Sequence, residues 1–387
     1  MTGRKLGLRK RIGLRLFSDL YAEKIAEHKL RTLFWECTLR CNLACRHCGS
    51  DCRVDPGVPD MPLADFLKVL DEEVTPHNRP EDVLLIFSGG EVLVRSDLEE
   101  AGREVTRRGY AWGMVTNGLA LDADRLRSLM DAGLRSISIS FDGFEDAHNY
   151  IRRNPRSFEK ALDAIRLIVR EPRLTYDVIT CVTSPMVARL EEFKELLIAE
   201  GVKYWRIFSI FPVGRAKDDP TLAVTDAQFR EVLEFIKRTR KEGRIDLSYA
   251  CEGFLGGYEG EVRDDFYQCA GRGFGCLDPG GRGDFGLYLH PGQFPSGEYL
   301  PGQFLGRVAE SLRQVPRPRM GPQRGVRRLQ DVAFLSGRRY APARRPGASD
   351  VLSLQAIAIV GNTIGERLSN RSLKLKIVPV RIIPTEH

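Results

Sequence analysis

Residues 33–52 read LFWECTLRCNLACRHCGSDC, a short apolar run followed by closely spaced cysteines. The run Leu33–Cys37 has the length and the aromatic content that are typical of a buried strand. Five of the nine cysteines in the chain fall between Cys37 and Cys52. In a reducing compartment, cysteines at this density indicate metal binding or redox chemistry rather than structural disulfides. The sequence therefore predicts a strand that leads directly into a reactive loop.

Short apolar runs alternate with helical periodicity from residue 32 to about residue 241. Apolar residues spaced i, i+3, i+4 and i+7 predict amphipathic helices, as at Leu63, Phe66, Leu67 and Leu70. Alternating strands and helices favour a parallel sheet, either an open doubly wound sheet or an incomplete barrel. The predicted strands are Leu33–Cys37, Val83–Phe87, Trp112–Thr116, Ser136–Phe141, Asp177–Thr183 and Tyr204–Ile210.

The spacing of the cysteines narrows the kind of metal site. Only Cys41, Cys45 and Cys48 form the pattern C-x3-C-x2-C. Three thiolates suit an iron–sulfur cluster and leave one of its irons open to a small ligand. The alternative is a structural zinc site made from four of the five cysteines, but such sites normally have two C-x2-C pairs or added histidines. Cys37 and Cys52 are unassigned, and we expect each to be a small buried side chain or an idle thiol.

With these three cysteines placed after a strand, residues 31–245 resemble the radical SAM superfamily. The resemblance implies an α/β fold, namely an incomplete (β/α)6 barrel similar to a TIM barrel. It also implies that Cys41, Cys45 and Cys48 hold a [4Fe-4S] cluster whose open iron binds S-adenosylmethionine. In that family, one electron from the cluster cleaves S-adenosylmethionine to a 5'-deoxyadenosyl radical, which abstracts hydrogen from a substrate.

Further matches to the family follow later predicted strands, as expected for groups that meet at one end of a barrel. The stretch Ser88–Glu91 (SGGE) resembles the GGE motif, whose glycines let the backbone approach the methionine amino group. Thr116–Gly118 (TNG) and Ser140–Gly143 (SFDG) are similar to family positions around S-adenosylmethionine, the second of them near the ribose. Taken alone, each of these motifs is also compatible with an ordinary turn.

Three other stretches complete the predicted site. HNYIRRNPRSFEKA resembles the region that carries an arginine for the methionine carboxylate, and we assign that role to Arg152. His47 fills the aromatic position of the last C-x-x-C, where the family uses mainly the backbone. RIFSIFPVGRA, residues 206–216, resembles a segment that lies beside the adenosine. No catalytic side chain is assigned, because the radical forms on the cofactor. The predicted cofactor-binding residues are His47, Gly89, Gly90, Glu91, Asn117, Ser140, Asp142 and Arg152.

The 387 residues suffice for two or three domains, and a change of composition marks one boundary. The net charge is +7, yet residues 272–387, which we call the tail, hold 18 Lys and Arg against 8 Asp and Glu. The preceding residues hold 41 against 44. We therefore expect four parts: a basic helical segment (1–31), a radical SAM core (32–245), the start of an auxiliary domain (246–271) and an irregular tail rich in Gly, Pro and Arg.

The sequence of the auxiliary domain is interrupted, because its first motif is present and the later cysteine motifs are not. CEGFLGGYEGEVRDDFYQC, with Cys251 and Cys269, resembles the entry to the SPASM domain, which binds auxiliary [4Fe-4S] clusters in many peptide-modifying members. A one-base shift of reading frame over residues 273–312 and 323–342 permits the missing cysteine motifs. We hypothesise that the tail is translated out of frame, which the coding nucleotide sequence tests. A genuine basic segment that binds nucleic acid is the alternative, but a tail with 18 basic residues of which only two are lysines suits it poorly.

These patterns predict a cytoplasmic radical SAM enzyme that abstracts hydrogen from a peptide or protein, the substrate class being implied by the SPASM resemblance. The expected electron donor is a protein such as flavodoxin or ferredoxin. A membrane partner is not expected, because no apolar run reaches 18 residues and the first thirty residues lack a secretory signal. A nucleic-acid partner is not expected either. The alternatives are an inert pseudo-enzyme with the same fold and a zinc-stabilised binding module.

Overall fold

The structure is a computed structural model that describes residues 7–8, 11–13, 15–16, 30–250 and 255–264, together with the backbone of 274–277 and 283–284. The predictions about Cys251, Cys269 and the reading frame of the tail lie outside these described residues. Among the described helices, none combines the length and the apolar content that crossing a bilayer requires.

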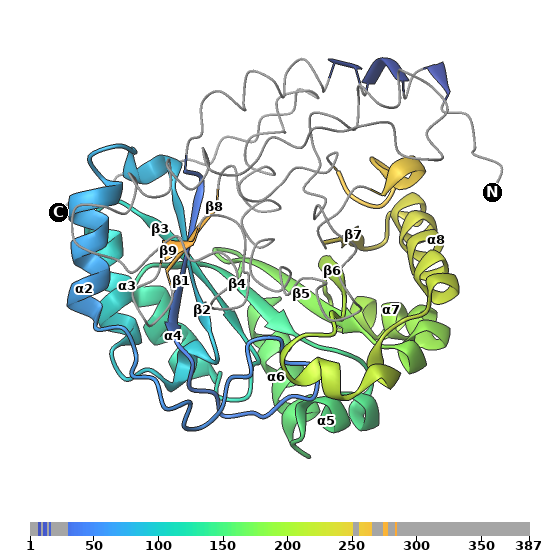
Figure 1. The fold of residues 1–387 in the computed structure, drawn as a ribbon, viewed down its shortest axis with the longest axis horizontal. Helices are drawn as coiled ribbons and strands as arrows, with labels where there is room; N and C mark the ends of the chain where they lie inside the picture. The colour runs from blue at the N-terminus through green and yellow to red at the C-terminus, as the bar shows by residue number, and fades with distance from the viewer. Residues whose placement is uncertain are drawn as a thin grey trace.

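One curved sheet forms the centre of the molecule, and eight of its nine described strands run parallel (Figure 1). The order is β7-β6-β5-β4-β3-β2-β1-β8-β9, so β1 and β7 do not pair and the barrel stays open. The six predicted strands are confirmed, and β7 was not predicted. The first seven parallel strands are β1 (Thr32–Thr38), β2 (Leu84–Gly89), β3 (Ala111–Thr116), β4 (Leu134–Ser140), β5 (Thr175–Val182), β6 (Tyr204–Ser209) and β7 (Asp246–Tyr249).

Two short strands lie beyond β7 in the sequence. β8 (Phe274–Leu277) pairs in parallel with β1, and β9 (Gly283–Asp284) pairs antiparallel with β8. Both belong to the segment that we expected to be irregular. The β1 edge of the sheet is therefore extended by backbone from the start of the tail.

The α-helices cover the outer, convex side of the sheet (Figure 1). Their apolar faces contact the strands, and this alternation of strand and helix is the expected α/β fold. α8 shows how local sequence sets the ends of a helix: Thr225 and Gln228 form a capping box, and Gly243 ends the helix at φ 70°. The helices are α2 (Leu63–Val69), α3 (Leu98–Arg107), α4 (Ala123–Asp131), α5 (Glu145–Arg152), α6 (Ser157–Ile168), α7 (Leu190–Ala199) and α8 (Asp226–Glu242).

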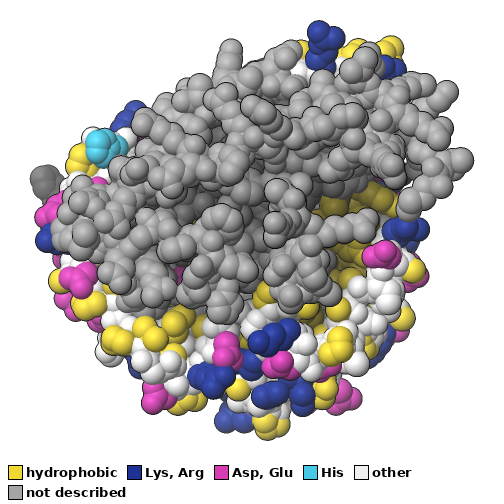
Figure 2. Space-filling model, viewed as in Figure 1, with side chains coloured by type: hydrophobic (Ala, Val, Ile, Leu, Met, Phe, Trp, Pro, Cys, Tyr) yellow, Lys and Arg dark blue, Asp and Glu magenta, His cyan; other side chains and the backbone are white. Residues whose placement is uncertain are grey.

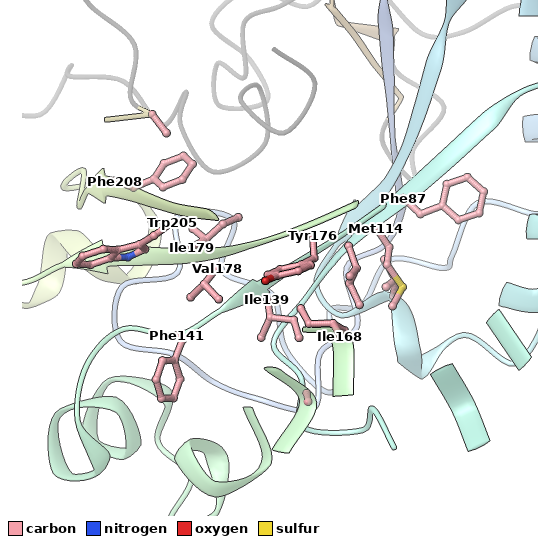
Figure 3. Close-up of a cluster of buried hydrophobic side chains, with 14 of the residues drawn as sticks. Phe87, Met114, Ile139, Phe141, Ile168, Tyr176, Val178, Ile179, Trp205 and Phe208 are labelled. Atoms are coloured by element: carbon pink, nitrogen blue, oxygen red, sulfur yellow. The ribbon is translucent and has the colours of Figure 1, made fainter. Parts of the chain in front are cut away.

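The core lies between the sheet and the helices. Trp35 stacks on Phe66 with ring centroids 4.0 Å apart and meets Phe87 edge-on at 5.0 Å. Figure 3 shows the continuation of this core, where Phe141 and Trp205 lie at the β4 to β6 end. Each fully buried apolar side chain of this size contributes about 1.5–3 kcal/mol, so the core fixes the strands whose ends carry the site.

The opposite face of the sheet is polar in its middle strands. Ser138 alternates along β4 with buried isoleucines that face the helices, so it points to the inner side. Its hydroxyl donates to Asp177 at 2.6 Å and accepts from Arg206 at 3.2 Å. Arg206 and Asp177 also form a buried ion pair. The inner side is therefore lined in part by a buried, hydrogen-bonded polar network rather than by apolar core, and Arg206 Nη1 is left without a partner among the described residues.

Candidate active site

The three predicted cluster ligands lie in one loop that leaves the end of β1. Cys41 and Cys45 are buried, and Cys48 is half-buried beside them. The backbone N–H of Cys41 donates to the carbonyl of Arg53 at 2.8 Å, which closes the loop at its base. We call residues 39–53 the cysteine loop. It presents an all-sulfur donor set, which suits an iron–sulfur cluster or zinc.

The local environment affects the loop thiols differently. Burial raises the pKa of Cys41 to about 12, and burial also raises the pKa of Cys45. A hydrogen bond from the Cys52 thiol lowers the pKa of Cys48 to about 6, although burial opposes this change. The same hydrogen bond raises the pKa of Cys52, so this unassigned cysteine lies against a predicted ligand. In the metal-free loop, at least two ligand positions are protonated thiols, and metal binding would release their protons.

Gly89 and Gly90 lie where the end of β2 runs against the start of the cysteine loop. Gly90 N–H donates to the Thr38 carbonyl at 2.7 Å. A Cβ atom on Gly89, which has φ +126°, would lie 2.1 Å from that same oxygen. A Cβ atom on Gly90 would lie 2.2 Å from the carbonyl oxygen of Arg40. The structure thus gives both glycines a reason that sequence analysis did not supply, since the main chain of the cysteine loop leaves no room for a side chain.

Glu91 is buried and its carboxylate accepts hydrogen bonds from the protein itself. The donors are Leu93 N–H at 3.1 Å, the Thr116 hydroxyl at 2.7 Å and Asn117 N–H at 2.8 Å. Burial raises the pKa of Glu91, and these donors oppose the rise. The Asn117 amide in turn donates to the Asn42 side chain at 2.8 Å, which links the end of β3 to the cysteine loop.

Asp142 lies two residues beyond Ser140, the half-buried last residue of β4, and is fully buried. Its carboxylate pairs with Arg152 at 2.6 Å and accepts from Cys181 N–H at 2.9 Å. His47 Nε2 lies 3.6 Å from the same carboxylate. Burial alone would raise the pKa of Asp142, but the positive charge of Arg152 brings it below the ordinary value. Burial lowers the pKa of His47 to about 4, so this imidazole is neutral at pH 7.

Arg152 connects this carboxylate to the cysteine loop. Its Nη1 donates to the Cys45 sulfur at 3.6 Å, while Nη2 pairs with Asp142. Its Nε is buried and has no hydrogen-bond partner among the described residues. The side chain that we assigned to the methionine carboxylate therefore lies at the cluster ligands and keeps one N–H unused.

His47, Asp142 and Cys181 also form a group whose possible metal-ligand atoms lie within 4.8 Å of one another. The positive charge of the Arg152 guanidinium beside Asp142 disfavours the binding of a cation there.

Two residues at the site were missed by sequence analysis. His148 is buried beneath Asp142, accepts from the Asp142 N–H at 3.0 Å and contacts the Ser157 hydroxyl at 3.1 Å. Arg215 follows β6 and donates to the carbonyl groups of Cys45 at 2.7 Å and Cys52 at 2.9 Å. We placed the Gly-Arg-Ala segment beside the adenosine, and in the structure it contacts the cysteine loop. Both residues lie in stretches that sequence analysis assigned to the site, HNYIRRNPRSFEKA and RIFSIFPVGRA, but a single histidine or arginine carries no spacing signal for its partners.

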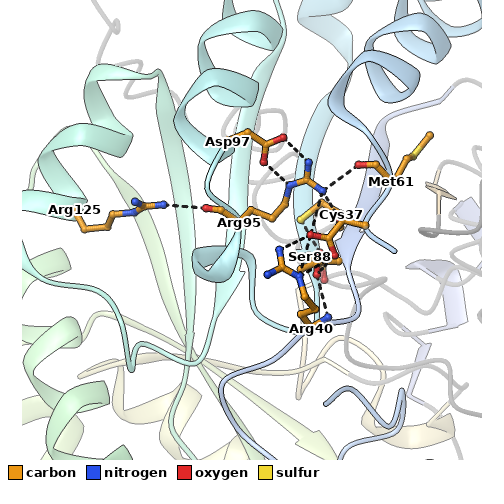
Figure 4. A network of polar contacts seen from close by, with 9 residues as sticks. Cys37, Arg40, Met61, Ser88, Arg95, Asp97 and Arg125 are labelled. Atoms are coloured by element: carbon orange, nitrogen blue, oxygen red, sulfur yellow. Dashed lines mark hydrogen bonds and ion pairs between the residues drawn. The ribbon is translucent and has the colours of Figure 1, made fainter. Parts of the chain in front are cut away.

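The base of the cysteine loop rests on a second polar network (Figure 4). The Arg95 guanidinium donates to the carbonyls of Cys37 at 2.6 Å and Met61 at 3.1 Å and pairs with Asp97. The Cys37 thiol is fully buried and donates to the Ser88 carbonyl at 3.3 Å. Arg40, at the start of the loop, is held by Asp60 at 3.1 Å. Cys37 thus faces away from the predicted ligands and helps to join β1 to β2.

The described surface around these elements carries charges of both signs. Figure 2 shows Lys and Arg side chains interspersed with Asp and Glu on the face in view. Arg53, for example, is exposed and pairs with Asp51 of the same loop at 2.6 Å. This part of the chain therefore presents mixed charge rather than a continuous basic patch.

Comparison with known proteins gives both a family and several relatives. The family model described as the radical SAM superfamily matches residues 35–197. An AdoMet-dependent heme synthase of Methanosarcina barkeri is 30% identical over 322 residues, which cover 80% of this chain and 87% of that protein. A PqqA peptide cyclase of Rhodopseudomonas palustris is 28% identical, covering 69% of this chain and 65% of that protein.

Other relatives are matched over a smaller share of their length. An AdoMet-dependent heme synthase of Oleidesulfovibrio alaskensis is 27% identical, and the match covers 57% of this chain and 56% of that protein. The fold is similar to the solved structure titled native anSMEcpe with bound AdoMet and Cp18Cys peptide, with a TM-score of 0.58 and 16% identity. That likeness covers 73% of this chain and 80% of the other.

Proposed function

The chain belongs to the radical SAM superfamily, and from this membership we propose that it reductively cleaves S-adenosylmethionine and removes a hydrogen atom from a substrate. The superfamily uses S-adenosylmethionine together with a [4Fe-4S] cluster. When bound, these groups supply a one-electron cleavage and the hydrogen-abstracting species. The observation that carries the proposal is the placement of Cys41 and Cys45, which are buried, and Cys48, which is half-buried, in one loop at the carboxyl end of β1.

We assign the cluster to these three cysteines because their thiolates are the soft donors that suit an iron–sulfur cluster. No Asp or Glu stands between Cys41 and Cys48 in the sequence. Gly89 and Gly90 keep the backbone of β2 against the start of the loop. That packing excludes bulk water from one side of the loop, which protects reactive chemistry from quenching.

The remaining predicted residues have distinct proposed roles at the cofactor. Arg152 has an unused, buried N–H and offers charge-assisted donation to the methionine carboxylate. Asp142 orients that guanidinium through their ion pair at 2.6 Å. Glu91 fixes Asn117 through its carboxylate, so we propose that it shapes the binding site rather than donating to the ligand. We propose that His47 and Ser140 form part of the wall of the cofactor-binding site, because both lie near Asp142.

For the substrate we propose a peptide or a protein side chain. The similarity to a PqqA peptide cyclase supports this class. A haem precursor is a second candidate, because the relative that is matched over 87% of its length is a heme synthase. In both cases, a one-electron donor protein such as flavodoxin or ferredoxin would reduce the cluster.

Anaerobic reconstitution tests the cluster and the cleavage together. The wild-type protein, incubated with iron and sulfide, should bind about four irons per chain at the Cys41, Cys45 and Cys48 site and release 5'-deoxyadenosine when dithionite and S-adenosylmethionine are added. Cys45→Ala should lose both properties, because it removes one ligand. Cys52→Ala is the matched control in the same loop and should retain the iron.

The alternatives predict different results. A zinc site that uses Cys52 as its fourth ligand would give colourless protein with tetrahedral sulfur-bound zinc, and both variants would lose metal. A pseudo-enzyme would bind cluster and S-adenosylmethionine and yield no 5'-deoxyadenosine. Cleavage that persists in Cys45→Ala would refute the ligand assignment. Adding a candidate peptide or a haem precursor to the active protein then separates the two substrate classes.

A further inference from the structure

Arg215 lies in the short helical segment Gly214–Asp218, which follows β6, and its side chain reaches across to the cysteine loop. Nε donates to the carbonyl of Cys45 at 2.7 Å, and Nη1 donates to the carbonyl of Cys52 at 2.9 Å. Nη1 also pairs with the Asp51 carboxylate at 2.8 Å. One guanidinium thus binds three acceptors spread over the second half of the loop.

The main chain of the same segment contacts the loop as well. Arg215 N–H donates to the carbonyl of Cys48 at 3.0 Å. Gly214 has φ +54°, and a Cβ atom there would lie 2.5 Å from the Cys48 carbonyl oxygen and 2.3 Å from that of Gly49. The glycine therefore allows an approach that any other residue would prevent, and this approach brings the arginine within reach of the loop.

These contacts meet a need that the loop cannot meet alone. The carbonyls of Cys45, Cys48 and Cys52 all accept hydrogen bonds from Arg215. Within the loop, the Cys45 carbonyl also accepts from Cys48 N–H, at the longer distance of 3.3 Å. Cys41 differs, because its N–H is bound to Arg53 within the loop itself. Arg215 is only 14% exposed, so its donors have little access to water.

We propose that Arg215 is a positioning residue that holds Cys45 and Cys48 in the arrangement required for cluster binding. The inference rests on the proposed function, since it takes these cysteines as ligands. Arg215 acts through the backbone of the ligands and touches none of their sulfur atoms in the contacts above. Residues that orient metal ligands in this way typically change metal affinity by about 10-fold to 100-fold when they are replaced.

The test compares Arg215→Met with three other variants in full-length protein reconstituted anaerobically. Arg215→Met keeps the length of the side chain and removes its donors, so the cluster should be lost to a chelator about tenfold faster than in wild type. Arg215→Lys should restore part of the retention, because an ammonium can bind one of the carbonyls. Asp51→Ala should stay close to wild type, because the Asp51 side chain is 42% exposed and only one of the contacts is removed.

Arg240→Met is the matched control elsewhere in the fold. Like Arg215, Arg240 combines a hydrogen bond to a carbonyl, that of Leu247 at 2.8 Å, with ion pairs, to Asp264 and, at 4.0 Å, to Asp246, and its side chain is 20% exposed. This variant should unfold at a similar temperature to Arg215→Met but keep its cluster. Hydrogen exchange of residues 41–52 in the metal-free protein gives a second readout, and it should accelerate in Arg215→Met alone.

The outcomes separate the two hypotheses. If the wild-type protein binds no iron, the proposed function fails, and hydrogen exchange still decides whether Arg215 orders the loop. If the wild type binds iron and Arg215→Met retains it equally well, with an unchanged electron paramagnetic resonance spectrum of the reduced cluster, the inference about Arg215 is refuted. Equal losses of cluster in Arg215→Met and Arg240→Met would also refute it, because they would indicate general destabilisation.

Discussion

The two halves of the cysteine loop are held by different kinds of contact. Its start is held mainly by main chain, because Gly90 and Glu91 donate from their backbone to the carbonyls of Thr38 and Arg40. Its end is held by side chains from distant elements, above all Arg215 after β6, in addition to main-chain contacts such as that from Arg215 N–H to the Cys48 carbonyl. Arg46 adds to the second half by stacking on Tyr150 of α5, with its guanidinium 4.1 Å from the ring centroid.

The difference has a consequence for substitutions. A main-chain contact at van der Waals distance leaves no space for a side chain, so it fixes the residue type as glycine. A side-chain contact can be weakened stepwise, because a shorter or uncharged residue keeps part of it. We therefore expect changes in the first half to affect folding most strongly and changes in the second half to affect cluster binding first.

Gly90→Ala should give the largest effect. The new Cβ atom would lie 2.2 Å from the Arg40 carbonyl oxygen, so either β2 or the loop must move. We expect a loss of about 3 kcal/mol in the free energy of unfolding, typical of a clash that the backbone must absorb, measured by urea denaturation. Gly257→Ala is the control, since its Cβ atom would meet nothing within 4 Å. A cost of less than about 1 kcal/mol at Gly90 would show that the loop start is adaptable.

The fold was largely predictable because its strands are short apolar runs at regular intervals. The predicted strand Trp112–Thr116 lies within β3, Ala111–Thr116, and the other five differ from the observed bounds by a few residues. β7 was missed, because Asp246–Tyr249 is four residues long and mixes polar with apolar side chains. Its apolar residues are buried by packing against α8, which only the folded chain provides.

The candidate site was predictable only where its signal is local. Cys41, Cys45 and Cys48 lie within eight positions of one another, so their spacing is visible in the sequence. Arg215 binds Cys45 from 170 positions away, and it is one of 59 Lys and Arg residues. The segment around it, RIFSIFPVGRA, indicated proximity to the cofactor but not which groups Arg215 would bind. The cysteines are therefore found by pattern, and their supports are found only by geometry.

The dependence of stability on pH tests the supports of the second half of the loop, because His148 accepts a hydrogen bond from Asp142, which faces that half. Burial lowers the pKa of His148 to about 3 from an ordinary value of 6.5. Between these values the unfolded chain binds more protons than the folded chain, so stability is fully present above pH 6.5 and falls as the pH is lowered. His148→Gln should reduce the stability difference between pH 7 and pH 5 by about 2 kcal/mol, measured by urea denaturation at both values.

The control for this change is His77→Gln, since His77 is exposed. It should leave the pH dependence of stability as in the wild-type protein. His47, whose pKa is lowered to about 4 by burial, keeps its own share of the acid sensitivity in both variants. If His148→Gln and wild type lose the same stability between the two pH values, His148 is not buried as a neutral imidazole.

Asp60→Asn should have the smallest effect and is the sharpest test of the division within the loop. Asp60 accepts from the Thr38 hydroxyl and from Arg40 Nε at 3.1 Å, so it is a side-chain support of the first half. It is 20% exposed and Arg40 is 42% exposed, so solvent screens the pair, and we expect a loss of about 1 kcal/mol in unfolding free energy. Because the main chain also holds this half, Asp60→Asn should retain the cluster as well as wild type, in contrast to Arg215→Met. Loss of cluster from Asp60→Asn at the rate seen for Arg215→Met would mean that side chains support both halves equally.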